Sequence, residues 1–110
     1  MLFHYNYSIK NSRAIILFEA NKYVDRQNRD KGIKNLREAM SILENCHKND
    51  DRKVYHSQKY AEFAIELNER FKIKDYLNQA LKWLKEIELK VGASKRTKNL
   101  IRKLENIINF

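Results

Sequence analysis

The chain carries few side chains that could do covalent or metal chemistry. Its single cysteine, Cys46, directly precedes His47, and His56 follows further along. A structural zinc site needs four Cys/His-type ligands, and adjacent residues on a helix point to different faces. We therefore expect no metal site and no Cys-His catalytic pair, and interpret Cys46 as a small core residue and His47 as a polar helix end. One cysteine also excludes a disulfide within the chain.

Other catalytic patterns are equally weak. The HEPN ribonucleases use a longer spacing between arginine and histidine than the three residues that separate Arg52 from His56. Glu62, Glu66 and Glu69 have a spacing that suits solubility and local ion pairs along a helix. No glycine-rich loop is present to hold a phosphate. The sequence thus predicts a non-enzymatic protein without cofactors, and a toxin-like or regulatory nuclease is the weakest alternative.

The composition favours long helices and an intracellular protein. There is no proline, and the two glycines are Gly32 and Gly92, which is little turn chemistry for an all-β domain. No apolar run reaches the roughly 18–20 residues of a membrane span. The N-terminus lacks the layout of a secretion signal, so we expect a cytoplasmic location. Residues 1–11 are interpreted as an irregular or helical lead-in, with a half-buried strand paired to another chain as the alternative.

Apolar residues spaced by three and four predict five helices, over about residues 12–28, 33–46, 52–71, 75–90 and 94–109. The expected helix N-caps are Ser12, Asp50 or Asp51, Asp75 and Ser94. Gly32 is predicted to form a left-handed turn with Asp30 and Lys31, and Gly92 to stop the fourth helix. The first helix offers two apolar stripes, Ala14, Leu17, Phe18 and Val24 in one and Ile16, Ala20 and Tyr23 in the other.

We predict one all-α domain over residues 1–110, in which antiparallel helix hairpins stack. It consists of an aromatic lead-in (1–11), a first helix pair (12–46), a second pair (52–90) and a capping helix (94–109). The two pairs share length and rhythm, with Ala39 and Ala80 in comparable places, which indicates a diverged repeat. Stacking buries the apolar face that each pair leaves open, and the last helix covers the end.

The segment FKIKDYLNQALKWL, with Phe71, Asp75, Tyr76 and Ala80, resembles the turn and second helix of a tetratricopeptide repeat. The resemblance is best over residues 60–89. It implies an α-α superhelix that acts as a protein-interaction or scaffold module, with a peptide-binding groove lined by the first helix of each pair. Such repeats also form C-terminal arrays of larger proteins, which leaves open that this chain is a piece of one. The groove residues implied by position are Glu62, Ile65, Glu69 and Lys72.

Positive charge is concentrated in the C-terminal half. The net charge is +9, and residues 70–103 hold eleven Lys/Arg against three Asp/Glu. A basic surface suits nucleic acid, acidic lipid or an acidic protein, although a solvated helical face is the simpler interpretation. The candidate basic patch comprises Lys95, Arg96, Lys98, Arg102 and Lys103. We expect a protein or peptide partner, with nucleic-acid binding through the last helix as the alternative function and self-association into a homodimer left open.

Overall fold

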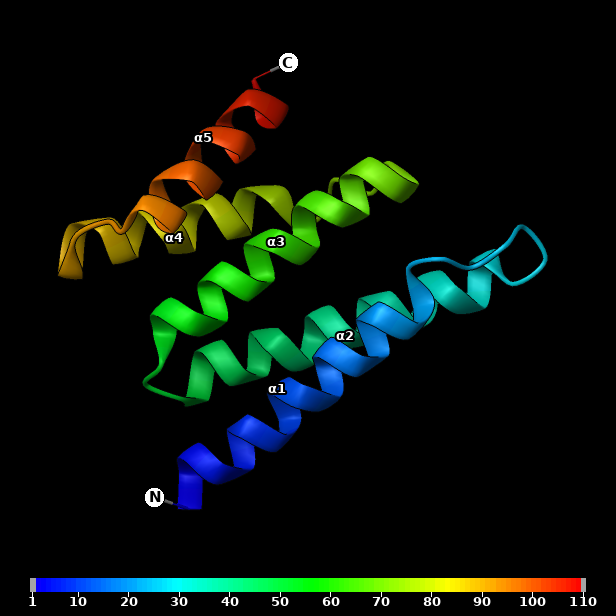
Figure 1. The fold of residues 1–110 in the computed structure, drawn as a ribbon, viewed down its shortest axis with the longest axis horizontal. Coiled ribbons are helices and arrows are strands. Elements are labelled where there is room, and N and C mark those ends of the chain that lie inside the picture. Colours follow the sequence, from blue (N-terminus) through cyan, green and yellow to red (C-terminus); the bar gives the residue numbers. More distant parts are fainter. Residues whose placement is uncertain (1, 110) are drawn as a thin grey trace. The chain divides into compact units, whose positions relative to one another are not determined.

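A computed structural model describes residues 2–109, with side chains for residues 7–109. Within that range the chain forms five helices and no strand, which confirms the predicted all-α class (Figure 1). The helices are α1 (Leu2–Asn21), α2 (Arg29–Asn49), α3 (Lys53–Phe71), α4 (Leu77–Val91) and α5 (Lys95–Ile108). None of these helices is both long enough and apolar enough to cross a bilayer.

The chain divides into two compact units, residues 1–52 and residues 53–110. The first unit contains α1 and α2, and the second contains α3, α4 and α5. The boundary between them falls in the short link that joins α2 to α3.

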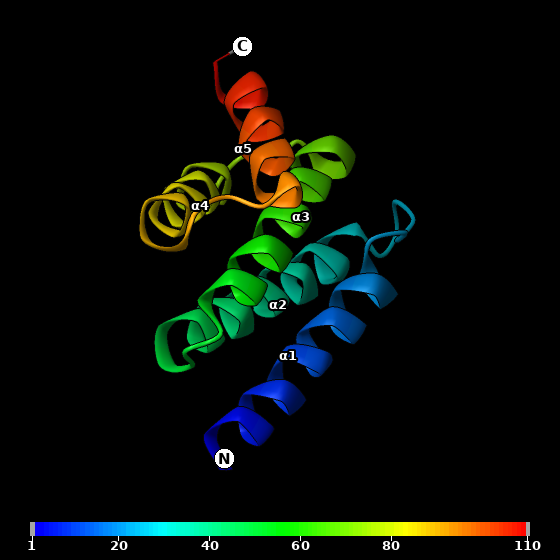
Figure 2. The ribbon, with the colours of Figure 1, turned by 60° about the vertical axis from the view of Figure 1, so that its left-hand side comes forward.

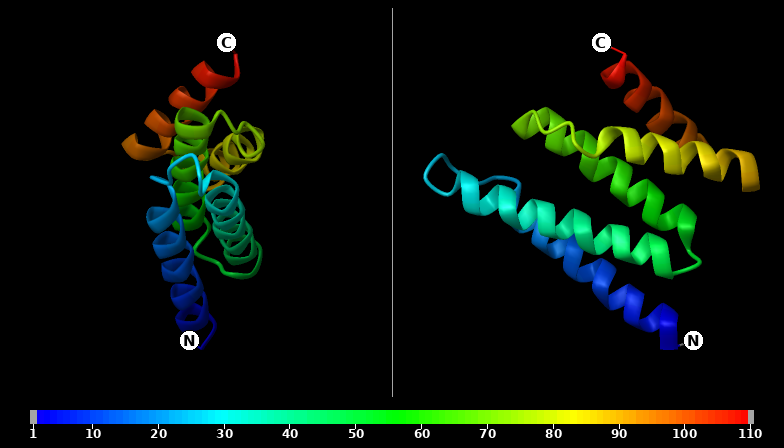
Figure 3. Two further views of the ribbon diagram at one scale, coloured as in Figure 1. Left: turned by 90° about the vertical axis from the view of Figure 1, so that its right-hand side faces the viewer. Right: turned by 180° about the vertical axis from the view of Figure 1, so that it is seen from behind.

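In the first unit, α1 and α2 form an antiparallel hairpin joined by residues 22–28 (Figure 3). Near the turn, Asn35 Nδ2 donates a hydrogen bond of 3.0 Å to Asn21 Oδ1. At the opposite end, Cys46 Sγ lies 3.8 Å from the backbone carbonyl oxygen of Tyr7. Among residues 7–52, the fully buried apolar side chains are Ala14, Phe18, Leu36, Ala39, Met40, Leu43 and Cys46. Ala14 and Phe18 belong to the first predicted apolar stripe, and Cys46 is a core residue as predicted.

Helix α1 differs at both ends from the prediction. It begins at Leu2, so the lead-in is helical from there and Ser12 lies inside the helix, where the N-cap prediction is wrong. No proline or glycine precedes Ser12 to interrupt the helix. The helix ends at Asn21, whose Nδ2 donates 2.7 Å to the Leu17 carbonyl oxygen. The loop that follows is shaped by Asp25, whose carboxylate accepts 3.0 Å from the Asn28 backbone N–H.

Gly32 lies within α2, and the predicted left-handed turn is wrong because the helix already begins at Arg29. The reason for glycine here is space. A Cβ at this position would lie 2.6 Å from both Cγ atoms of Val24, which is closer than van der Waals contact. Glycine therefore lets the loop side chain of Val24 rest directly on the backbone of α2.

In the second unit, α3 and α4 form a hairpin and α5 packs against both (Figure 2). Aromatic rings fill the α3–α4 interface: the centroid of Tyr60 lies 4.7 Å from that of Trp83 and 6.1 Å from that of Tyr76. Ala80 is fully buried on α4. An ion pair of 3.4 Å between Lys85 Nζ and Glu105 Oε2 joins α4 to α5.

In the second unit, the predicted helix ends at the turn between α4 and α5 are confirmed, whereas the predicted N-cap of α4 is wrong. Gly92 has φ +83° and ends α4, and Ser94 caps α5 by accepting 3.2 Å from the Thr97 backbone N–H. In contrast, Tyr76 rather than Asp75 precedes α4. Asp50 also has a different role, because it follows α2 as its C-cap.

The close contact at Gly32 predicts that Gly32→Ala destabilises the protein. Overpacking of this kind costs about 1–3 kcal/mol, which outweighs the roughly 1 kcal/mol that alanine gains over glycine in a helix. Val24→Ala in the Gly32→Ala background should recover part of the loss, because it removes both clashing methyl groups. Urea unfolding followed by circular dichroism measures both effects, and a Gly32→Ala variant more stable than wild type would contradict the contact.

Candidate functional site

A surface hollow of about 640 Å³ lies between α3 and α5. Its lining combines three cationic side chains, one carboxylate, one amide and one leucine, which are Lys95, Arg96, Lys103, Glu62, Asn99 and Leu100. We call it the α3–α5 hollow. All of its lining residues except Glu62 come from α5, so the position of that helix decides the chemistry of the site.

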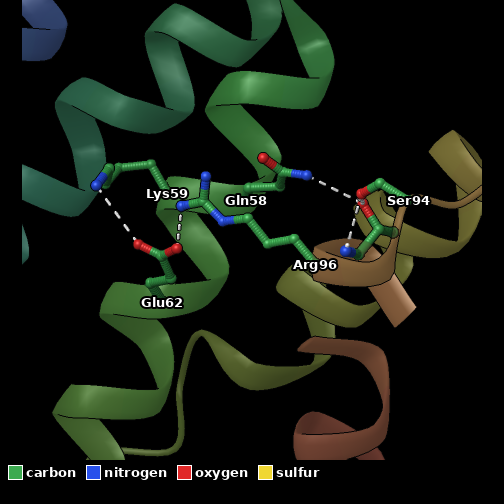
Figure 4. Close-up of polar contacts among 6 residues, drawn as sticks. Gln58, Lys59, Glu62, Ser94 and Arg96 are labelled. Atoms are coloured by element: carbon green, nitrogen blue, oxygen red, sulfur yellow. Dashed lines mark hydrogen bonds and ion pairs between the residues drawn. The ribbon is translucent and has the colours of Figure 1, made fainter. Parts of the chain in front are cut away.

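Buried hydrogen bonds fix the start of α5 against α3 (Figure 4). Gln58 Nε2 on α3 donates 3.1 Å to Thr97 Oγ1 on α5, and both side chains are buried. Ser94 Oγ donates 3.2 Å to the same Thr97 oxygen. Because buried polar groups require partners, these bonds define where α5 begins on the surface of α3.

Glu62 is the acidic centre of the α3–α5 hollow. Its carboxylate accepts from Arg96 through one oxygen and from Lys59 through the other, the latter at 3.4 Å (Figure 4). Both pairs are partly exposed, so each contributes little to stability, on the order of 0–1 kcal/mol. Their main effect is to hold the Arg96 guanidinium toward α3 while Glu62 is neutralised.

The remaining cations of α5 are not compensated. Lys95 and Lys103 line the hollow, whereas Lys98 and Arg102 lie outside its lining. All four side chains are exposed, and none has an ion-pair partner in the described part of the chain. The structure thus places the five predicted basic-patch residues on one helix, with Arg96 as the member that is paired.

The four predicted groove residues lie in different environments. Glu62 lines the α3–α5 hollow, and Ile65 is buried. Glu69 is exposed, and Lys72 lines a separate hollow of about 410 Å³ with Asn68, Lys74, Asn106 and Ile107. Sequence reasoning did not identify Asn99 or Leu100 as site residues. Their place in the hollow follows from the packing of α5, which no local motif encodes.

Cys46 and Arg52, two of the residues tested for catalytic chemistry, make contacts within the first unit. Cys46 is buried, and burial raises the pKa of its thiol, with the nearby charge of Lys10 acting in the opposite direction. Arg52 Nε donates 2.7 Å to Asp50 and its Nη1 donates 2.9 Å to Ser8 Oγ. Among the side chains of residues 7–109, no three His, Cys, Asp or Glu residues form a group that could hold a metal ion.

Comparisons with known protein families, curated proteins and solved structures find no match to this chain. The tetratricopeptide resemblance therefore stays a prediction that rests on residues 60–89. The hollow and the charges of the second unit are the observations from which a function can be inferred.

Lys72 has a backbone conformation that glycine would adopt at lower cost. Its φ is +59°, and its N–H bonds to the Asn68 carbonyl oxygen at 3.0 Å, the pattern of a left-handed helix C-terminus. We expect Lys72→Gly to raise the free energy of unfolding by about 1 kcal/mol, because the left-handed conformation costs an L-residue about that much. Lys72→Ala, which removes the same side chain but keeps Cβ, is the control in the same urea unfolding experiment. Equal effects of the two variants would contradict this explanation.

Proposed function

We propose that the chain is a non-enzymatic binding module whose second unit binds an acidic segment of a partner protein in the α3–α5 hollow. The observation that carries this proposal is a convergence of two predicted sites. Glu62, nominated as a groove residue, lines the same hollow as Lys95, Arg96 and Lys103 of the basic patch. The predicted groove residue Glu62 and three residues of the predicted basic patch thus line one hollow.

The chemistry of the hollow suits carboxylate side chains on a peptide. Lys95 and Lys103 are exposed and have no ion-pair partner among the described residues, so they can form charge-assisted hydrogen bonds. Leu100 gives the lining an apolar part, and Asn99 adds an amide donor and acceptor. Arg96 is paired with Glu62, so Lys95 and Lys103 are the cations of the hollow that remain for a bound carboxylate. A volume of about 640 Å³ accommodates a few side chains rather than a folded domain.

The tetratricopeptide-like scaffold role and the cytoplasmic location belong to the same proposal. The α3–α4 hairpin supports the scaffold role, because Ala80 is fully buried and Phe71 is mostly buried in this hairpin. A small residue in a helix-helix interface allows the close approach that stacked hairpins need. In this proposal, the hairpins are a rigid support and α5 supplies the cations that contact the partner.

Binding of a fluorescein-labelled peptide rich in Glu and Asp tests the proposal by fluorescence anisotropy. Lys95→Glu with Lys103→Glu should lower affinity at least about tenfold, because charge-assisted hydrogen bonds contribute about 1.5–3 kcal/mol each. Lys31→Glu with Lys34→Glu, at exposed positions of α2, makes the same change in net charge and should leave affinity within about twofold. An equal loss in both double variants would show that only net charge matters and would contradict a site in the hollow.

Nucleic-acid binding through α5 is a second candidate, and it rests on a separate observation. Lys98 and Arg102 are exposed outside the hollow lining, without an ion-pair partner among the described residues. The acidic residue of this helix, Glu105, is held by Lys85. Such a face would contact phosphates rather than base edges, because it offers cations without an aromatic side chain for stacking.

Anisotropy with single-stranded RNA and duplex DNA over a series of salt concentrations tests this second candidate. Phosphate contacts by Lys98 and Arg102 predict that log affinity falls with log salt with a slope of about −2 for duplex DNA and about −1.4 for a single strand. Lys98→Glu with Arg102→Glu should abolish this binding and leave acidic-peptide binding within about threefold, whereas Arg102→Glu with Lys103→Glu should weaken both. Absence of binding at low salt would exclude the second candidate, and unaltered binding by both variants would exclude α5 as the contact.

A further inference from the structure

An exposed apolar stripe runs along α1 and ends just beyond it. Ile9, Ile16 and Tyr23, the last just beyond the helix, follow one another at intervals of seven residues and are 45%, 68% and 70% exposed. Seven residues are about two turns, so side chains at this interval share one face of a helix. The buried residues Ala14 and Phe18 lie on the opposite face. Two residues of the second predicted stripe, Ile16 and Tyr23, thus face away from the core.

A hollow of about 340 Å³ lies beside this stripe, between α1 and α2. Arg13 and Glu38 both line it, yet neither has an ion-pair partner in the described part of the chain. The register of the hairpin explains why they do not pair with each other. Asn35 bonds to Asn21 near the turn, and Cys46 lies against Tyr7 at the other end, so Glu38 on the antiparallel α2 lies level with about residue 17. That level is about 6 Å along the helix axis from Arg13.

We propose that this face of α1 binds the same face of α1 in a second copy of the chain, with the two helices antiparallel about a two-fold axis beside Ile16. Ile9 and Tyr23 are both seven residues from Ile16. An antiparallel pair centred on Ile16 therefore sets Ile16 against Ile16, and Ile9 against Tyr23 of the second copy. Such an interface uses one surface twice, as two-fold dimers do.

The unpaired charges are complementary in the same arrangement. Arg13 lies three residues before Ile16, about 4.5 Å along the axis, and Glu38 is level with a point about one residue after Ile16, about 1.5 Å along it. Reversing the second helix brings Arg13 of one copy to within about 3 Å of the axial level of Glu38 of the other. Arg13, Leu17 and Ala20 all lie on the flank of α1 that faces α2, because they line that hollow.

The two-fold axis keeps this flank on the same side in both copies. Two Arg13–Glu38 pairs therefore form across the interface, although neither pair forms within one chain. A helix of another protein would need the same seven-residue apolar spacing, with a carboxylate opposite Arg13 and a cation opposite Glu38. A second copy of the chain has both features. An interface of one helix pair belongs to the small class of interfaces, so we expect a reversible dimer in the micromolar range rather than an obligate one.

Sedimentation equilibrium of the full chain, from micromolar to millimolar concentration, tests the proposal. Wild type should show a reversible monomer–dimer equilibrium, and Ile16→Lys should stay monomeric while keeping the circular dichroism spectrum and urea midpoint of wild type. Leu89→Lys is the matched control, since Leu89 is an apolar side chain on α4 that is 87% exposed. A monomeric wild type, or Leu89→Lys reducing association as much as Ile16→Lys, would overturn the proposal.

Charge reversal tests the antiparallel arrangement itself. Arg13→Glu and Glu38→Arg should each weaken dimerisation at least about fivefold, and the double variant should return the dissociation constant to within about twofold of wild type. Rescue by the double variant supports direct pairing between copies, whereas additive weakening would overturn it. These variants lie in the first unit, so acidic-peptide binding by the second unit is a separate measurement with a separate outcome.

Discussion

The hydrogen bond between Gln58 and Thr97 determines what the second unit can present to a partner. It joins two helices through side chains that are both buried and 39 residues apart in sequence. Removing the Thr97 hydroxyl would leave the buried Gln58 amide without this acceptor, at a cost of about 1–3 kcal/mol. Sliding or rotating α5 on α3 would incur the same cost. A helix with one apolar face and many cations is therefore held in a single register.

That register decides which charges are neutralised. Glu62 meets Arg96, and Glu105 meets Lys85, because α5 begins where Ser94 and Thr97 place it. The other four cations of α5 have no ion-pair partner and remain uncompensated in the part of the chain that the structure describes. The basic character of the C-terminal half is thus a matter of geometry as well as composition. Charge that has no internal partner is the charge available for an external one.

The sequence predicted those features that depend on local periodicity and missed those that depend on contacts between elements. Five helices, the buried positions Ala14 and Phe18 of α1 and the signals at Gly92 and Ser94 follow from spacing and turn chemistry. Ser12 was misread because a good capping residue is also tolerated inside a helix. Gly32 was misread because its requirement comes from Val24 across the hairpin turn. The two halves of the site were each singled out, but nothing local indicates that Glu62 and Arg96 meet.

The backbone conformation of Gly92 is one that a D-residue adopts more easily than an L-residue. Its φ of +83° and ψ of 171° are the mirror image of ordinary extended backbone, and a Cβ built there has nothing within 4 Å. The position is therefore closed to L-residues by chirality and not by crowding, unlike Gly32. A D-alanine introduced at Gly92 by chemical synthesis would adopt these φ and ψ values without the backbone strain that an L-residue incurs. It would also restrict the unfolded chain, and so favour the folded turn that connects α4 to the basic helix.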